Sequence, residues 1–200
     1  MSNLVYALED AAQPGVYGAA GTEGPGVTIS EHRPESMLQL GAWPDTQASF
    51  EALLASTLNL SVPSRPGLAS VSSEGSLLVI APGRYLLVSD KPGITQQLSG
   101  QIDADQGVVT DLSHARAGIR MTGRNAADVL RKGFAIDLDI RKFPVHSVAQ
   151  TTFHHIGLTL HRTDETTFEL FIFRGFALSF WEALTDAALE YGYQVAGAGQ

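Results

Sequence analysis

One order of expected elements occurs twice along this chain, and this repetition limits what the chain can fold into. Each copy is predicted to run strand, strand, helix, hairpin, helix, first over residues 27–100 and again over 107–195. The interval from Pro63 to Leu77 in the first copy equals that from Pro144 to Leu158 in the second. The sequence therefore predicts an α+β fold of two similar halves, in which helices cover one face of antiparallel sheet.

The first copy has its clearest signals in a helix and a hairpin. A helix is expected after Pro44, because apolar residues then recur at helical spacing: Phe50, Leu53, Leu54 and Leu58. The pair Pro82-Gly83 separates two apolar runs, which is typical of a tight hairpin turn. The remaining elements are predicted as strands at 27–31 and 37–40 and a helix near 93–98.

The second copy repeats this order. The expected strands and helices are strands at 108–112, 117–121 and 148–153, a hairpin of 158–162 with 168–173, and helices at 125–132 and about 176–191. Asn125 is predicted to cap the first helix and Gly133 to end it. The last helix carries an apolar stripe at helical spacing that includes Phe180 and Trp181.

The two ends of the chain differ in composition from this repeated region. Residues 1–26 are predicted to be a flexible N-terminal arm, because their glycines and prolines disfavour a regular element. Leu4, Val5, Tyr6 and Leu8 are apolar enough for such an arm to become ordered on a partner. Residues 196–200 are predicted to be a flexible tail, which leaves one folded domain at 27–195.

Composition narrows the class of function. A net charge of −8 with 13 basic residues argues against nucleic-acid binding, which depends on clustered Lys and Arg. The chain has no cysteine, so disulfides, thiolate catalysis and iron–sulphur ligation are excluded. The sequence shows no long apolar run and no signal peptide, and we expect a cytoplasmic protein without a membrane span.

Two groups of polar residues resemble catalytic or metal sites. Ser113 and His114 are adjacent on an expected strand, so their side chains point to opposite faces and cannot form a nucleophile–base pair. We expect Asp111 to accept backbone hydrogen bonds at the end of that strand. His154 and His155 are adjacent, so only one of them could meet His161 across the sheet. A catalytic zinc site usually has three protein ligands, and no third ligand is evident here. Surface or partner-facing histidines are the better interpretation. We therefore expect no catalytic residue and no metal site.

The second hairpin and the last helix carry the candidate contacts with a partner. His161, Arg162 and Arg174 flank the hairpin, where exposed arginines pair readily with a carboxylate on a partner. The alternative is a set of solvated salt bridges of little energetic value. Trp181 is large enough to anchor an interface, although its helical spacing also favours packing in the core.

Several motifs occur in an order that points to a known family. They are Thr110-Asp111-Leu112-Ser113-His114, Ile119-Arg120-Met121-Thr122-Gly123, Ala126-Ala127-Asp128-Val129-Leu130, Leu160-His161-Arg162 and Phe180-Trp181-Glu182-Ala183-Leu184. This series resembles the gamma subunit of heterotetrameric sarcosine oxidase and, more distantly, the folate-binding aminomethyltransferases. The resemblance implies a duplicated fold with exchanged first strands, without the C-terminal barrel of the transferases.

The resemblance also implies a function. It predicts a non-catalytic gamma subunit that assembles with alpha, beta and delta subunits, which hold FAD, FMN, NAD and tetrahydrofolate and demethylate sarcosine to glycine. The transferases carry a catalytic acid in a Gly-x-x-Asp-Asp segment, whereas the matching segment here places Leu160 at that position. A one-residue slip would bring Thr159 or His161 there, and neither is an acid. The alternatives are a free-standing folate-binding transferase-like protein and a free-standing binding protein.

Overall fold

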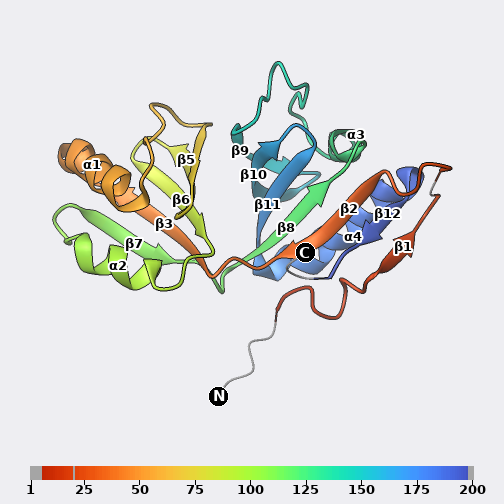
Figure 1. The fold of residues 1–200 in the computed structure, drawn as a ribbon, viewed down its shortest axis with the longest axis horizontal. Coiled ribbons are helices and arrows are strands. Elements are labelled where there is room, and N and C mark those ends of the chain that lie inside the picture. Colours follow the sequence, from red (N-terminus) through yellow and green to blue (C-terminus); the bar gives the residue numbers. More distant parts are fainter. Residues whose placement is uncertain (1–5, 20, 198–200) are drawn as a thin grey trace. The chain divides into compact units, whose positions relative to one another are not determined.

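A computed structural model describes residues 6–19 and 21–197, which form two compact units (Figure 1). The five-stranded unit contains residues 34–114 and 146–149. The seven-stranded unit contains the described residues up to Arg33, residues 115–145, and the described residues from Gln150 onward. Both units combine mainly antiparallel strands with helices, as the repeated pattern predicts, and the seven-stranded sheet also contains one parallel pair of strands.

The five-stranded unit has a sheet backed by two helices. Its strands, in spatial order, are β4 (Ala69–Ser72), β5 (Gly75–Ala81), β6 (Arg84–Ser89), β3 (Ser36–Ala42) and β7 (Gly107–Asp111). The helices are α1 (Gln47–Leu58), which follows a short 3-10 turn at Pro44–Thr46, and α2 (Ile94–Gln101). The predicted stripe of α1 is confirmed, since Phe50, Leu54 and Leu58 are fully buried in one core with Leu38 and Leu87 from the sheet.

The predicted hairpin turn between β5 and β6 is also present. Ala81 pairs with Arg84 across Pro82 and Gly83, and Gly83 has a φ of 62°. Proline sets the backbone of the first turn residue, and glycine tolerates the left-handed conformation of the second. The local sequence therefore determines this turn.

The seven-stranded unit contains the other hairpin and the last helix. Its strands, in spatial order, are β1 (Gly15–Tyr17), β12 (Tyr193–Val195), β2 (Val27–His32), β8 (Arg116–Thr122), β11 (Thr167–Phe173), β10 (Ile156–Asp164) and β9 (Val148–Phe153). The helical elements are α3 (Ala126–Arg131), α4 (Ala177–Ala188) and short 3-10 turns at Arg174–Phe176 and Leu189–Tyr191. No helix of the described residues is long and apolar enough to cross a membrane.

The two units exchange their first strands. Strand β2 opens the first copy of the sequence pattern, yet it pairs with β8 of the second copy. Strand β7 opens the second copy, yet it pairs with β3 of the first. The compact units therefore differ from the sequence halves 27–100 and 107–195, and the exchange that the family resemblance implies is present.

The N-terminal segment departs from the prediction that it lacks a regular element. Strand β1 pairs with β12, and Leu8 is fully buried. The Leu8 amide donates a hydrogen bond to Glu31 Oε1 at 3.3 Å, while Arg33 Nε donates to Glu31 Oε2 at 2.9 Å. Pairing with β12 supplies the hydrogen bonds that a glycine-rich segment does not form alone. Leu4 and Val5 lie outside the described residues.

Two further differences are local. Strands β4 and β12 were not predicted, and both are short. Strand β4 pairs with β5 across a two-residue turn, whereas β12 pairs with β1 and β2, which are far away in the sequence. Asn125 stands before α3 without a side-chain capping bond, and its Nδ2 donates to Asp128 Oδ2 at 3.1 Å. The prediction that its side chain caps the helix is therefore wrong.

Candidate functional site

A row of polar side chains crosses one face of the seven-stranded sheet. Glu169 on β11 pairs with His161 on β10 and with Arg120 on β8. Arg120 pairs in turn with Ser30 on β2, and His32 follows Ser30 by two residues. Residues directly opposite one another in adjacent strands share a face, as do residues two apart on one strand. The register therefore brings these five side chains together.

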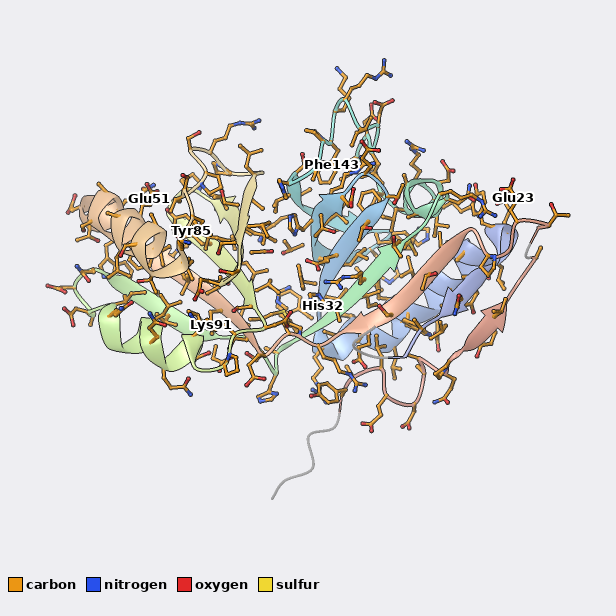
Figure 2. The ribbon with its side chains drawn as sticks, viewed as in Figure 1. Glu23, His32, Glu51, Tyr85, Lys91 and Phe143 are labelled. Carbon is orange, nitrogen blue, oxygen red and sulfur yellow. The ribbon has the colours of Figure 1, made fainter. Side chains whose placement is uncertain are left out.

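Glu169 lies at the centre of this row and is 4% exposed. Arg120 Nη2 donates a hydrogen bond to Glu169 Oε1 at 2.7 Å. Nδ1 of His161 lies 3.5 Å from Oε2, and Nδ1 of His32 lies 3.5 Å from Oε1 (Figure 2 labels His32). The carboxylate thus has a basic group beside each oxygen.

These neighbours keep Glu169 ionised in spite of its burial. Burial by itself would raise the pKa of this carboxyl group. Three interactions outweigh this effect of burial: hydrogen bonding with His161, the charge of His32 and the hydrogen bond from Arg120. Together they lower the pKa of Glu169 from 4.5 to about 2. The cluster of Glu169, Arg120, His161 and His32 is called the Glu169 cluster below.

The opposite face of the same strands is apolar. Leu160 pairs with Leu170, and Leu170 pairs with Ile119; all three are fully buried. Helix α4 lies against this sheet and buries an apolar stripe that includes Phe180 and Leu184 (Figure 1). Since apolar faces pack together, Leu160 belongs to the helix-covered core, one residue away from the polar face of His161.

Three of the four candidate contact residues are buried within this chain. His161 is 0%, Arg162 4% and Trp181 5% exposed, whereas Arg174 is exposed. The expectation of an exposed Arg162 is wrong, and His161 belongs to the Glu169 cluster. Trp181 packs in the interior beside the stripe of α4. Contact with a partner through Arg174 stays a prediction.

Arg162 is buried because it holds a loop of its own unit. Its Nη1 donates to the carbonyl oxygens of Leu138 at 3.1 Å and Phe143 at 2.8 Å, and its Nη2 donates to the carbonyl of Glu165. Phe143 is labelled in Figure 2 near the base of the loop that projects from the unit. Arg162 thus satisfies loop carbonyls that no regular element would satisfy.

The residues that resembled catalytic groups have structural roles. The Ser113 amide donates to Asp111 Oδ1 at 2.9 Å, as expected for an acid at a strand end. The Met37 amide donates to Ser113 Oγ at 3.0 Å. Hydrogen bonding with Ser113 lowers the pKa of Asp111. These contacts tie β7 to β3.

The three histidines with possible metal spacing do not converge. His154 and His155 are exposed at the turn between β9 and β10, whereas His161 is buried. Among residues 6–19 and 21–197, no group of three or more His, Cys, Asp or Glu side chains has metal-binding geometry.

The Glu169 cluster was missed by the sequence reasoning apart from His161. One signal was present, because Glu169 interrupts an otherwise apolar strand, Phe168-Glu169-Leu170-Phe171-Ile172. An acid at such a place is seldom buried without a partner. The identity of the partners, Arg120 and His32, depends on strand order and was not accessible from the sequence.

Comparisons with known proteins agree with this fold. A family model described as the GCVT N-terminal domain matches residues 70–200. The gamma subunit of sarcosine oxidase from Corynebacterium sp. (strain U-96) is 30% identical over 167 residues, which cover 82% of this chain and 80% of the relative. The chain belongs to the sarcosine oxidase gamma subunit family.

Other members and solved structures extend this result. The gamma subunit from Arthrobacter sp. is 30% identical over 64% of each chain. One chain of the heterotetrameric sarcosine oxidase from Corynebacterium sp. U-96, solved with pyrrole 2-carboxylate, matches with a TM-score of 0.75 and 29% identity; the match covers 91% of this chain and 90% of that one. The glycine cleavage system aminomethyltransferase T from Bartonella henselae shares the fold, with a TM-score of 0.64 and 14% identity.

Proposed function

We propose that this gamma-subunit homologue is the non-catalytic gamma subunit of a heterotetrameric sarcosine oxidase. In this role it assembles with larger alpha and beta subunits and a delta subunit, and it supports the oxidative demethylation of sarcosine to glycine. The observation that carries the proposal is the 30% identity to a gamma subunit over most of both chains. The complex is proposed to be cytoplasmic.

The geometry around Leu160 supports a non-catalytic role. Leu160 stands where the resemblance places the transferases' catalytic acid, and it is buried on the helix-covered face of the sheet. A leucine side chain cannot accept a proton from the amine of a one-carbon donor. The residues at this position therefore do not fit folate-dependent group transfer.

The neighbouring acid does not replace the missing one. Glu169 pairs with His161 on the polar face, but the residue is 4% exposed and its carboxylate accepts a hydrogen bond from Arg120. Because the pKa of Glu169 is lowered to about 2, the group is a poor proton acceptor near neutral pH. This arrangement is that of a structural ion cluster.

FAD, FMN, NAD and tetrahydrofolate are proposed to be held by the other subunits. The absence of cysteine and of a glycine-rich dinucleotide motif from this sequence agrees with that division. The chain's contribution is then to complete the assembly.

Coexpression tests the proposal. The full chain is produced with tagged alpha subunit and with beta and delta subunits, and the tagged complex is analysed for subunit composition and sarcosine-dependent peroxide production. We expect stoichiometric retention of this chain, and no flavin absorbance or peroxide production by the chain alone. Failure to join the complex would overturn the proposal. Binding of tetrahydrofolate tighter than roughly 10 µM, about −7 kcal/mol, would favour a free-standing folate-binding protein.

A further inference from the structure

The segment that joins β11 to α4 exposes three large apolar side chains in close succession. Phe173 is 51%, Phe176 53% and Leu178 54% exposed. Arg174 lies among them and is exposed, and Arg116 lies beside Phe173. The 173–178 patch is the name used below for Phe173, Arg174, Phe176 and Leu178 together with the neighbouring Arg116, all in the seven-stranded unit.

The backbone beneath the patch is held in place. Phe173 pairs with Arg116 across β11 and β8, and the Arg174 amide donates to the Ala115 carbonyl at 2.9 Å. Ala177, between the exposed Phe176 and Leu178, is 1% exposed and anchors the first turn of α4. The exposed rings therefore project from a fixed surface, and little conformational entropy is lost when a partner covers them.

Arg116 gives the patch a specific chemical requirement. Its guanidinium carbon lies 3.7 Å from the centre of the Phe173 ring. Its Nε is buried and has no hydrogen-bond partner among the described residues. A buried donor without an acceptor is costly. The Arg116 side chain as a whole is only half-buried, and a guanidinium stacked on an aromatic ring is well placed to receive a carboxylate at its exposed part. The patch is thus cationic on a chain whose net charge is −8.

The patch differs from the other exposed apolar residues. Elsewhere among the described residues, exposed side chains such as Val71 (49%) and Ile140 (41%) stand singly along the sequence, and Val16 and Tyr17 are exposed neighbours on β1. Single exposed apolar residues are ordinary on soluble proteins, whereas aromatic residues grouped with arginine are typical of interface centres.

We infer that the 173–178 patch is the docking surface for a segment of a larger oxidase subunit that presents a carboxylate beside apolar side chains. The carboxylate pairs with Arg116 and Arg174, and the apolar side chains cover Phe173, Phe176 and Leu178. The inference rests on the proposed function, because the occupant is one of the subunits of that complex.

Two double variants of the full chain test the inference. The patch variant carries Arg174→Glu and Phe176→Asp. The control variant carries Arg65→Glu and Val71→Asp, which makes the same change of charge at exposed positions of the five-stranded unit. All four substituted side chains are exposed, so both variants are expected to keep the wild-type melting temperature. Each is coexpressed with the alpha, beta and delta subunits, and the affinity for the complex is measured after purification.

We expect the patch variant to bind the larger subunits at least about tenfold more weakly than wild type, with the control variant unchanged. A patch variant that assembles like wild type overturns the inference and leaves the proposed function intact. A wild-type chain that does not assemble overturns the proposed function itself. Equal loss in both variants, or a wild-type homodimer that the patch variant abolishes, also counts against a hetero-subunit docking surface. A photo-reactive benzoylphenylalanine at position 176, compared with one at position 71, then identifies the subunit by cross-linking.

Discussion

The two units have sheets of similar construction but bury different chemistry. Among the described residues, the buried polar side chains of the five-stranded unit are all hydroxyls: Ser36, Ser89 and Ser147. The buried charged and histidine side chains of the described residues all lie in the seven-stranded unit: Glu31, His161, Arg162 and Glu169. One unit is therefore stabilised mainly by apolar packing, and the other also depends on a correct arrangement of charges.

The same contrast appears where each unit pairs an acid with a ring. In the five-stranded unit, the Tyr85 hydroxyl donates to Glu51 Oε1 at 2.6 Å, at the margin of the core (both are labelled in Figure 2). Burial and the neighbouring Glu51 raise the pKa of Tyr85, so its hydroxyl stays a neutral donor. In the seven-stranded unit, Glu169 is enclosed and needs several basic neighbours. The difference shows that duplicated folds need not duplicate the chemistry of their sheets.

The largest expected effect is on the apolar face, where the two units should behave alike. Leu160→Asp places a carboxylate in a fully buried position, and so does Leu87→Asp in the five-stranded unit. Each is expected to lower the free energy of unfolding by more than about 4 kcal/mol, as judged by urea denaturation. The restored acid at position 160 is expected to produce no folate-dependent activity. Near-normal stability of Leu160→Asp alone would show that Leu160 faces water, against the structure.

Removing an acid should destabilise the seven-stranded unit more than the five-stranded unit. Glu169→Gln leaves Arg120 without its carboxylate and is expected to lower the free energy of unfolding by about 2–4 kcal/mol. Glu51→Gln retains an acceptor for Tyr85, and the expected loss is below about 1 kcal/mol. Both values come from urea denaturation at neutral pH. Equal losses would contradict the idea that charge arrangement distinguishes the units.

Protonation of the same carboxyl should have a related effect, no larger than that of the substitution. The pKa of Glu169 in the folded chain, about 2, lies below the ordinary value of 4.5. The unfolded chain therefore binds the proton first, and the stabilisation present above about pH 4.5 is lost as the pH falls toward 2. Urea denaturation from about pH 6 to pH 3 should show a steeper decline in wild type than in Glu169→Gln. Hydrogen exchange should place the loss of stability in β8, β10 and β11. An equal decline of the free energy of unfolding with pH in wild type and Glu169→Gln would contradict this prediction.

The smallest expected effect concerns the loop held by Arg162. Arg162→Met removes the donors to Leu138 and Phe143 and is expected to cost about 1–2 kcal/mol, with faster hydrogen exchange over residues 138–143. Arg141→Met is the matched control, because the Arg141 side chain is 84% exposed and pairs with Asp139 in solvent. Its free energy of unfolding and its hydrogen exchange are expected to stay close to those of wild type. Unchanged exchange in Arg162→Met would show that the loop is held by other contacts.

Much of the site could not be derived from the sequence, for an identifiable reason. His161 and Arg162 were named as candidate contacts with a partner and were expected at the surface, where charged residues mostly lie. Their burial depends on which strands lie beside β10 and on the loop that returns to it. Arg120 is separated from Glu169 by 49 residues along the chain. No local pattern encodes such a pairing.

The sequence by itself determined the elements whose signals are local: the stripe of α1, the Pro82-Gly83 turn, the hairpin of β10 and β11, and the duplicated order of strands and helices. Local signals suffice there because backbone preference and apolar periodicity act over a few residues. Only the tertiary structure decided the pairing of β1 with β12, the membership of the Glu169 cluster and the side of the sheet that Leu160 faces. Those features depend on strand order and register, which bring together residues from distant parts of the chain.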